Sequence, residues 1–481
     1  NSDRFETIKP NIYTCAVGLI PADVKDKSES SPGMIIVRIG GPTWRIGVGG
    51  GAASSMGAGE NKSDLDFKSV QRGEPMMGRN AYNVIEECVF MGEQNPIESI
   101  HDQGAGGASN VLTELTESCG GVIDLAKMNI ADSSLSQTEA WVAESQEIYG
   151  LLIKPENLGV LKLICHRHNC PIEVLGETNN SGKITVIDSR DISKPVNLGL
   201  EEILGKLPQK TYEDNSVVYD LGSPLETNIS QKVLLQRVAA IPGVALLDYM
   251  VDHFDGSVGG RVVQGPRCGI NQLPICNYGL ISTGFKGVTG SLGIFTRSNP
   301  MAMLGNERAN ARMLVAQVLM NLSLVVIPGR TSKIKNRINV MWPFKKPGMK
   351  ARLYSAYQEL TSALSIAGLG VDGGKDSLSM TVKFEDVEVS SFPSFVIESY
   401  AHVADFRRRV TPDLKNEDSK LLLINPSKLK GSLGCTALSE SHDIAGSDTP
   451  DVDVKKAKKV FDLMQYLIRN KKILAASPVQ K

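Results

Sequence analysis

A glycine-rich segment that occurs twice is the feature that most constrains how this chain can fold. The sequence IGVGGGAAS at 46–54 is repeated as LGVDGGKDS at 369–377, 323 residues further on. Five of the nine positions are identical, and a sixth exchanges Ile for Leu. This period is too long for a solenoid. We therefore expect two related halves, each contributing one glycine turn after a strand, with a chance match between glycine-rich stretches as the alternative.

The composition is that of a globular protein. The chain has 481 residues with 46 glycines and a net charge of −1, and its length suggests about three domains. The balanced charge argues against nucleic acid or a membrane surface as a partner, and no apolar run is long enough to span a bilayer. Eight cysteines are too few for a disulfide scaffold and favour reduced thiols in the cytoplasm. A chain that begins at Asn1 without a targeting segment is expected to be part of something longer.

Apolar spacing predicts alternating strands and helices. Strand patterns occur at 34–39, 148–153, 184–187, 322–327, 395–398 and 420–424, and helical periodicity occurs at 78–91, 306–322, 351–367 and 454–469. This alternation predicts an α/β or α+β layered fold. The polar segment 188–230 contains three prolines and is interpreted as a connector between the two halves.

Three glycine clusters could bring backbone N–H groups close to an anion. They are Gly47–Gly51, Gly104–Gly107 and Gly370–Gly374. Neither the Walker spacing nor the dinucleotide-binding GxGxxG spacing follows a strand in a βαβ context. Purely structural turns remain the alternative for each cluster.

The segment from His101 to Gly107 places a carboxylate beside one of these clusters. Asp102 could hold Mg²⁺ while the neighbouring N–H groups take phosphate. The alternative is that Asp102 caps a helix predicted at 108–117.

Three further polar groups are candidates for ligand contacts. Glu144–Glu147 comes just before an apolar strand and would suit a polar substrate, although a solvated turn is the common alternative. The same alternatives apply to Gln71–Glu74. At the second glycine motif, Lys375, Asp376 and Ser377 combine a phosphate-seeking cation with a carboxylate and a hydroxyl, or form a buried ion pair.

The densest group of possible metal ligands is Cys165–Cys170, which contains two cysteines and two histidines. Zinc sites usually need two separated ligand pairs, and none is evident. We therefore favour a corner between a helix at 158–165 and a strand at 171–175 over a metal site.

Many of these strings occur together in one enzyme family. The motifs are GPTWRIGVGGGAASS at 41–55, SDLDF at 63–67, VQRG at 70–73, NPI at 95–97, HDQGAGG at 101–107, ESQE at 144–147, SVGG at 257–260, DGGKDSLSM at 372–380 and TPDLK at 411–415. The series is similar to the large eukaryotic type of phosphoribosylformylglycinamidine synthase, the amidotransferase of purine synthesis. The resemblance spans essentially the whole chain.

The resemblance implies a duplicated PurM-like synthetase architecture with pseudo-two-fold halves of two α/β subdomains each. On this basis the subdomains would be the end of a first PurM-N-like part at 1–60, a PurM-C-like part at 61–210, a connector at 211–230, a second PurM-N-like part at 231–412 and the start of a second PurM-C-like part at 413–481.

The family converts formylglycinamide ribonucleotide, ATP and glutamine-derived ammonia to the amidine, with the amide oxygen activated as an iminophosphate. The resemblance implies that the site residues comprise substrate contacts at Gln71, Glu144, Ser145, Gln146 and Ser377, nucleotide contacts at Cys276, Gly374 and Lys375, and a Mg²⁺ ligand at Asp102.

The second half departs from the family's metal-binding pattern. Positions where the family has Mg²⁺ carboxylates correspond to Asn277, Gln317 and, at the chain end, Val479, and only Asn321 keeps the family's ligand type. Because Mg²⁺ prefers anionic oxygen, neutral side chains lose most of that attraction. We expect a weakened or lost nucleotide site in this half.

No catalytic residue of the family is expected within the chain, because its catalytic histidine would precede Asn1 and its glutaminase domain would follow Lys481. The resemblance implies as partners the ribonucleotide, ATP and ammonia from a glutaminase domain, within a larger assembly. Two hypotheses therefore follow from the sequence: an ATP-dependent C–N ligase seen in part, and an inactive relative that serves as a structural or binding subunit.

Overall fold

The computed structural model describes residues 4–7, 13, 18, 20–45, 56, 60, 74–226, 228–245, 247–253, 256, 258–329, 331–384, 387–427 and 431–479. These residues belong to two compact units. The small unit is Ile20–Thr211, and the large unit combines Asn1–Leu19 with Tyr212–Lys481. Each unit is described by itself.

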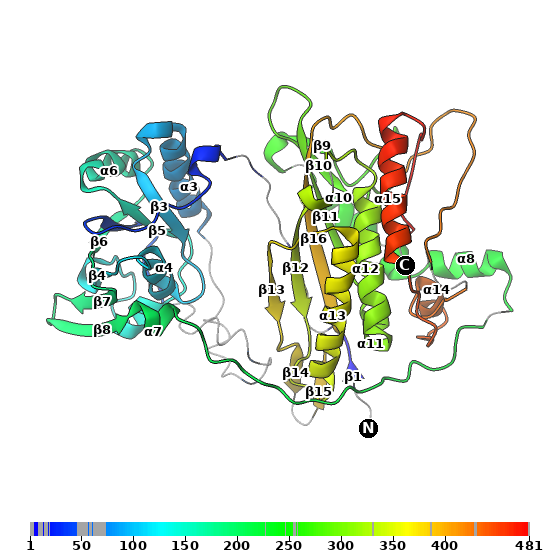
Figure 1. The fold of residues 1–481 in the computed structure, drawn as a ribbon, viewed down its shortest axis with the longest axis horizontal. Coiled ribbons are helices and arrows are strands. Elements are labelled where there is room, and N and C mark those ends of the chain that lie inside the picture. Colours follow the sequence, from blue (N-terminus) through cyan, green and yellow to red (C-terminus); the bar gives the residue numbers. More distant parts are fainter. Residues whose placement is uncertain are drawn as a thin grey trace. The chain divides into compact units, whose positions relative to one another are not determined.

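A seven-stranded mixed sheet organises the small unit (Figure 1). The strands follow the order β3 (Ile97–Asp102), β5 (Ile148–Ile153), β2 (Ile35–Gly40), β6 (Ile172–Thr178), β4 (Gly121–Asp124), β7 (Lys183–Asp188) and β8 (Ser193–Gly199). Only the β4–β7 pair is parallel among the strand pairs described in this sheet.

Helices cover both faces of this sheet. Successive side chains of the interior strand β2 are apolar and point to opposite faces, so each face needs a covering layer. Ile36 packs with α4 (Gly107–Leu115) and with Trp141 of α5 (Gln137–Val142). Val37 and Ile39 pack with two helices on the other face. These helices are α3 (Pro75–Phe90) and α6 (Leu158–Arg167), and the unit ends with α7 (Leu200–Leu204). Short 3₁₀ turns lie at Ala22–Val24, Gly92–Gln94, Leu125–Lys127 and Pro155–Asn157.

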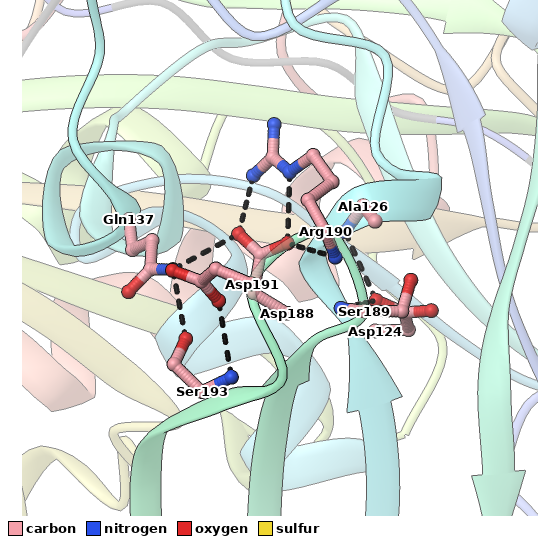
Figure 2. Close-up of polar contacts among 8 residues, drawn as sticks. All are labelled: Asp124, Ala126, Gln137, Asp188, Ser189, Arg190, Asp191 and Ser193. Carbon is pink, nitrogen blue, oxygen red and sulfur yellow. Dashed lines mark hydrogen bonds and ion pairs between the residues drawn. The ribbon is translucent and has the colours of Figure 1, made fainter.

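A network of hydrogen-bonded polar side chains lies in the small unit where the strands β4 and β7 end (Figure 2). The Arg190 guanidinium donates two hydrogen bonds to the Asp188 carboxylate, at 2.8 and 2.5 Å. The Gln137 amide donates to Asp188, Asp191 and Ser193. Asp188 is almost fully buried, so these donors replace the water that its charge would otherwise bind.

The large unit contains a six-stranded sheet and a small three-stranded sheet. The larger follows the order β13 (Gly373–Ser377), β12 (Lys335–Met341), β16 (Ser394–Val403), β11 (Gly290–Arg297), β10 (Gly279–Ser282) and β9 (Val262–Gln264). The smaller pairs β1 (Arg4–Phe5), β15 (Val387–Ser390) and β14 (Thr381–Phe384). Within the six-stranded sheet, β12 and β13 are parallel and the other described pairs are antiparallel.

Three long helices build the core of the large unit against this sheet (Figure 1). They are α12 (Glu307–Leu322), α13 (Met349–Ala367) and α15 (Val454–Arg469), which contribute buried apolar side chains to one cluster with Leu292, Val340 and Phe395 of the sheet. Shorter elements are α8 (Gln231–Ala239), α9 (Pro242–Ala245), α10 (Leu247–His253), α11 (Pro300–Gly305) and α14 (Ala437–Glu440), with 3₁₀ turns at Val258–Gly260 and Thr331–Lys333.

The long periodic segments fold as their sequence predicts. All four predicted helices form, with α15 at the expected bounds, and the strands expected at 34–39, 148–153, 184–187 and 395–398 form as β2, β5, β7 and part of β16. Two strand predictions are wrong. The run at 322–327 begins at the last residue of α12, and the run at 420–424 is exposed and in neither helix nor strand. An apolar run alone does not distinguish these outcomes, because the pairing partner is not local.

The connector prediction is only partly right. Residues 193–204 of the segment 188–230 form β8 and α7, because β8 pairs with β7 and extends the sheet of the small unit. The remainder up to residue 226 contains no helix or strand among its described residues. The structure divides the chain into two units only. The finer division into subdomains, with boundaries at 60/61, 210/211, 230/231 and 412/413, stays a prediction.

Candidate functional site

Three loops meet at one end of the small-unit sheet. β5 lies between β3 and β2, with Tyr149 opposite Asp102 on one side and Ile148 opposite Gly40 on the other. The Ala143–Glu147 segment that enters β5 is therefore flanked by the loop after β3 and the loop after β2. The candidate substrate residues thus lie beside the candidate metal ligand.

Two glycines allow the backbone to approach the Ala143–Glu147 segment from both sides. A Cβ atom on Gly40 would lie 1.9 Å from the carbonyl oxygen of Glu147, and one on Gly107 would lie 2.3 Å from that of Ala143. Both glycines also have positive φ, at +116° and +62°. Any other residue at either position would both strain the backbone and collide with it.

Hydrogen bonds hold the middle of the same segment. The buried Gln103 side chain donates from Nε2 to the carbonyl oxygen of Ser145 at 2.7 Å. The N–H of Trp44 donates to the Ser145 hydroxyl at 3.0 Å, and the N–H of Gly41 donates to the carbonyl of Glu147 at 3.2 Å. The segment is therefore ordered although it belongs to no helix or strand.

A buried ion pair supports the β2 side of the site. The Arg38 guanidinium donates to both carboxylate oxygens of Glu173, at 2.8 and 3.1 Å, and to the Thr43 hydroxyl at 2.9 Å. Arg38 is 1% exposed. Such a pair fixes the chain between Gly40 and Trp44, because neither charge can move without losing its partner.

Asp102 lies at the open rim of the site. Its side chain is 80% exposed, and Nδ1 of the His101 ring lies 3.7 Å from its carboxylate. The capping interpretation of Asp102 is wrong, because the residue before α4 is Gly106, which has positive φ and supplies no side-chain cap. An exposed carboxylate five residues before a nine-residue helix that begins without a side-chain cap fits the way Mg²⁺ binds, through one or two carboxylates and ligand phosphates.

Glu147 marks a strained point at the end of the segment. Its φ is +57°, which is uncommon for a residue with a side chain. Burial raises the pKa of its carboxyl, and burial followed by the charges of Asp102 and Glu147 raises the pKa of the Tyr149 hydroxyl. The charged groups of the site therefore influence one another.

The substrate residues named from the sequence differ in exposure. Gln146 is exposed, Glu144 is half-buried and Ser145 is 3% exposed. Ser145 therefore supports the loop with a hydroxyl that already accepts a hydrogen bond. Gln71 and the cluster Gly47–Gly51 lie outside the described residues.

The second glycine cluster does not form the predicted turn. Gly373 and Gly374 belong to the edge strand β13, and Gly370 precedes it. None of the three has positive φ. Gly374 is needed for close approach instead, since its Cβ would lie 2.0 Å from the carbonyl oxygen of Ile338. Lys375 and Asp376 are exposed, so the buried-pair alternative is also wrong.

The remaining residues named for the second half lie on several elements. Asn321 is buried on α12 and its Nδ2 donates to the Thr296 hydroxyl at 3.2 Å, and Gln317 lies one helical turn earlier. Cys276 is buried, which raises its pKa to about 11. Asn277 is half-buried and Val479 is 81% exposed, and Ser377 accepts a hydrogen bond from the N–H of Trp342.

Over the described part of the chain, no three His, Cys, Asp or Glu side chains are grouped to hold a metal ion. Cys165–Cys170 forms the expected corner between α6 and β6. Among the described helices, none is long and apolar enough to cross a membrane.

Sequence reasoning missed the residues that hold the site together. Gln103 lies in the HDQGAGG motif, but the sequence gives it no role of its own. Nothing in the sequence marks Gly40 or Glu147 as more important to the site than the residues next to them. A buried amide facing two carbonyl groups leaves no local pattern in a sequence. The adjacent Gly40 and Gly41 were the one available signal.

Comparisons with known proteins agree with the resemblance seen in the motifs. Residues 31–189 match the family model "AIR synthase related protein, C-terminal domain", and residues 247–402 match the "FGAR-AT PurM_N-like domain". A probable phosphoribosylformylglycinamidine synthase of Arabidopsis thaliana is 36% identical over 100% of this chain, and the human phosphoribosylformylglycinamidine synthase is 34% identical over 100%. The chain is a homologue of the phosphoribosylformylglycinamidine synthases. It covers 35% and 37% of these two relatives, about a third of their length.

Solved structures show the same fold. The structure described as "T. maritima PurL complexed with FGAR" has a TM-score of 0.63 at 18% identity, over 92% of this chain and 63% of that one. "T. maritima PurL complexed with ATP" has a TM-score of 0.56 at 16% identity, over 82% and 57%. The chain therefore has a PurM-like synthetase fold of mixed α/β sheets, as its homology implies.

Proposed function

We propose that this chain is a synthetase portion that takes part in the ATP-dependent conversion of formylglycinamide ribonucleotide and ammonia to the amidine. The observation that carries the proposal is the convergence of the Asp102–Gly107 loop with the Ala143–Glu147 segment, in a chain homologous to the synthases over its full length. Two solved structures of T. maritima PurL, which has the same fold, are described as complexed with FGAR and with ATP.

In the small unit, the residues proposed to contact the ribonucleotide are Gln71, Glu144, Ser145 and Gln146. Ser145 would contribute by holding the segment in place, because its hydroxyl accepts a hydrogen bond from Trp44 and its carbonyl accepts one from Gln103. The N-terminal turn of α4 offers backbone N–H groups to phosphate oxygens. Asp102 would hold Mg²⁺, which when bound neutralises phosphate charge.

In the large unit, the proposed ligand contacts are Cys276, Gly374 and Lys375 for nucleotide and Ser377 for substrate. Lys375 is exposed and can reach an anion from the edge strand β13. Asn277, Gln317 and Asn321 offer only neutral donors and acceptors for a cation, so we propose that Mg²⁺–nucleotide binding is weak here.

The wider setting is proposed from the homology. Ammonia would come from a glutaminase, and the chain would act in a larger assembly in the cytoplasm. These points concern the full length of the relatives, of which this chain spans about a third.

Two measurements test the proposal. Calorimetry should detect binding of formylglycinamide ribonucleotide to the 481-residue chain, and the full-length protein should form the amidine from the ribonucleotide, ATP and ammonia. D102N should raise the Mg²⁺ concentration needed for half-maximal turnover, whereas D26N, at a similarly exposed carboxylate of the same unit, should not.

Absence of ribonucleotide binding would overturn the substrate assignment. Binding without any turnover by the full-length protein would support the inactive structural subunit, the alternative that the sequence raises.

A further inference from the structure

Gln103 is a buried polar residue that the proposed chemistry does not use. It follows Asp102 directly and is 4% exposed. Its backbone N–H donates to the carbonyl of Ile148 at 2.9 Å, which continues the hydrogen bonding between β3 and β5. Its side chain leaves this ladder and reaches the adjacent segment.

The Gln103 amide satisfies carbonyl groups that have no partner in a helix or strand. Nε2 lies 2.7 Å from the oxygen of Ser145 and 3.5 Å from that of Ala143. Both acceptors belong to a segment outside regular secondary structure. Without this donor, the carbonyl of Ser145 would lose a partner in the interior, which costs far more than losing one in water.

The position of Gln103 links the two proposed subsites. The ends of the Ala143–Glu147 segment are fixed by the close approach of Gly107 and Gly40, whereas its middle is held by Gln103. The same residue is covalently bound to Asp102, the proposed cation ligand. A shift in either loop must therefore move the other or break the hydrogen bond.

We infer that Gln103 is a positioning residue that couples cation binding at Asp102 to ribonucleotide binding at the Ala143–Glu147 segment. Each ligand then binds more tightly when the other is present, because the loop position that one ligand favours is passed to the other loop through this hydrogen bond. This inference rests on the proposed function, although the hydrogen bond itself can be tested without any ligand.

Two substitutions separate the hydrogen bond from the shape of the side chain. Q103M keeps the length of the side chain but removes the donor. Q103E keeps the shape and places a carboxylate against two carbonyl oxygens, which repels them while it is ionised. Q94M makes the same change as Q103M at an exposed position of the small unit and is the matched control.

The first measurement is amide hydrogen exchange of the ligand-free chain. Exchange across residues 143–148 should become about tenfold faster in Q103M, since one buried hydrogen bond is lost, and stay unchanged in Q94M. Unchanged exchange in Q103M would overturn the inference whatever the chain binds.

The second measurement is calorimetric binding of formylglycinamide ribonucleotide with and without Mg²⁺. In the unmodified chain and in Q94M, Mg²⁺ should strengthen ribonucleotide binding. In Q103M the ratio of the two affinities should fall towards one. An equal ratio in all three proteins would refute the coupling, whereas no binding to the unmodified chain would instead refute the proposed function.

The third measurement uses pH to restore the donor. A protonated carboxyl in Q103E can donate to the Ser145 carbonyl, so the ribonucleotide affinity of Q103E relative to Q103M should rise as the pH falls. The ionisable groups near this point are common to both variants, and they include Asp102, Glu144 and Glu147 together with the neighbouring His101, Glu74 and Tyr149. Parallel pH profiles for Q103E and Q103M would show that Gln103 only fills space and would contradict the inference.

Discussion

The small and large units use glycine for different physical reasons. In the small unit, Gly40 and Gly107 combine positive φ with backbone contacts that no side chain could allow. In the large unit, Gly374 makes an equally close contact in an extended edge strand, and Gly370 has neither constraint. Glycine therefore serves a tightly packed loop cluster in the small unit and an exposed edge strand in the large unit.

The polar groups around these glycines differ in the same way. The small unit surrounds its loops with the buried Arg38–Glu173 pair and the buried Gln103 amide. The glycine-containing strand β13 of the large unit carries exposed Lys375 and Asp376. The difference indicates that buried polar contacts hold the small-unit loops to one another, whereas these side chains of β13 face solvent.

The largest expected effect tests whether the buried ion pair supports the small unit. R38M leaves Glu173 charged and unpaired in the interior, so we expect a loss of about 3–5 kcal/mol in the unfolding free energy. R407M removes the ion pair with Asp405 in the large unit, in which Arg407 faces solvent, and should cost much less. Denaturant unfolding followed by hydrogen exchange in β2 and β16 reports the two units separately. Equal losses of unfolding free energy in R38M and R407M would contradict a special role for the buried pair.

A series of alanine substitutions sharpens the distinction between strain and contact. G107A combines positive φ with a 2.3 Å contact and should destabilise the small unit by about 2–4 kcal/mol. G374A meets a backbone oxygen but lies in an edge strand that can separate from β12, so its cost should be smaller. G370A meets nothing within 4 Å and should change stability by less than about 0.5 kcal/mol. Thermal unfolding of each variant gives the order, and any other order would contradict the assignment.

The smallest expected effect concerns pH and the corner network of the small unit (Figure 2). The hydrogen bonds from Arg190 lower the pKa of Asp188 to about 2. Burial opposes ionisation of Asp124, but N–H groups of Ser189 and Ala126 outweigh it and lower its pKa. A carboxylate with a lowered pKa stabilises the fold above its ordinary pKa of about 3.9, and this stability is lost as the pH falls towards 2.

D188N should therefore reduce the loss of small-unit stability between about pH 4 and 2. D405N is the matched change in the large unit, where Arg407 lowers the pKa of Asp405 to about 2. It should flatten the acid dependence of the large unit only. Hydrogen exchange at several pH values measures both, and an unchanged acid profile in D188N would refute the role of the network.

Much of the fold was predictable because it depends on local periodicity. The helices α3, α12, α13 and α15 and the strands β2 and β5 were evident from the spacing of apolar residues. The failures share one cause. Residues 322–327 and 420–424 have the composition of strands, but a strand also requires a neighbour that pairs with it, which the segment itself does not encode.

The candidate site was predictable only in its residue types. Asp102 and Glu144–Gln146 were selected because carboxylates, amides and glycines suit phosphate and cation chemistry. Their proximity was not evident, because it arises from β5 lying between β3 and β2. The sequence also predicts a turn at Gly370–Gly374. In the structure Gly373 and Gly374 belong to a strand instead, because they pair with β12.

Composition, spacing and motifs are enough to predict the α/β character of the chain, its homology and the chemistry available to its loops. Tertiary structure decided which loops meet, which polar groups are buried and which glycines are strained. The physical reason is that burial and long-range hydrogen bonding depend on neighbours far apart in the chain. Gln103 illustrates this: in the sequence it is an ordinary polar residue, and in the fold it joins two loops separated by about 40 residues.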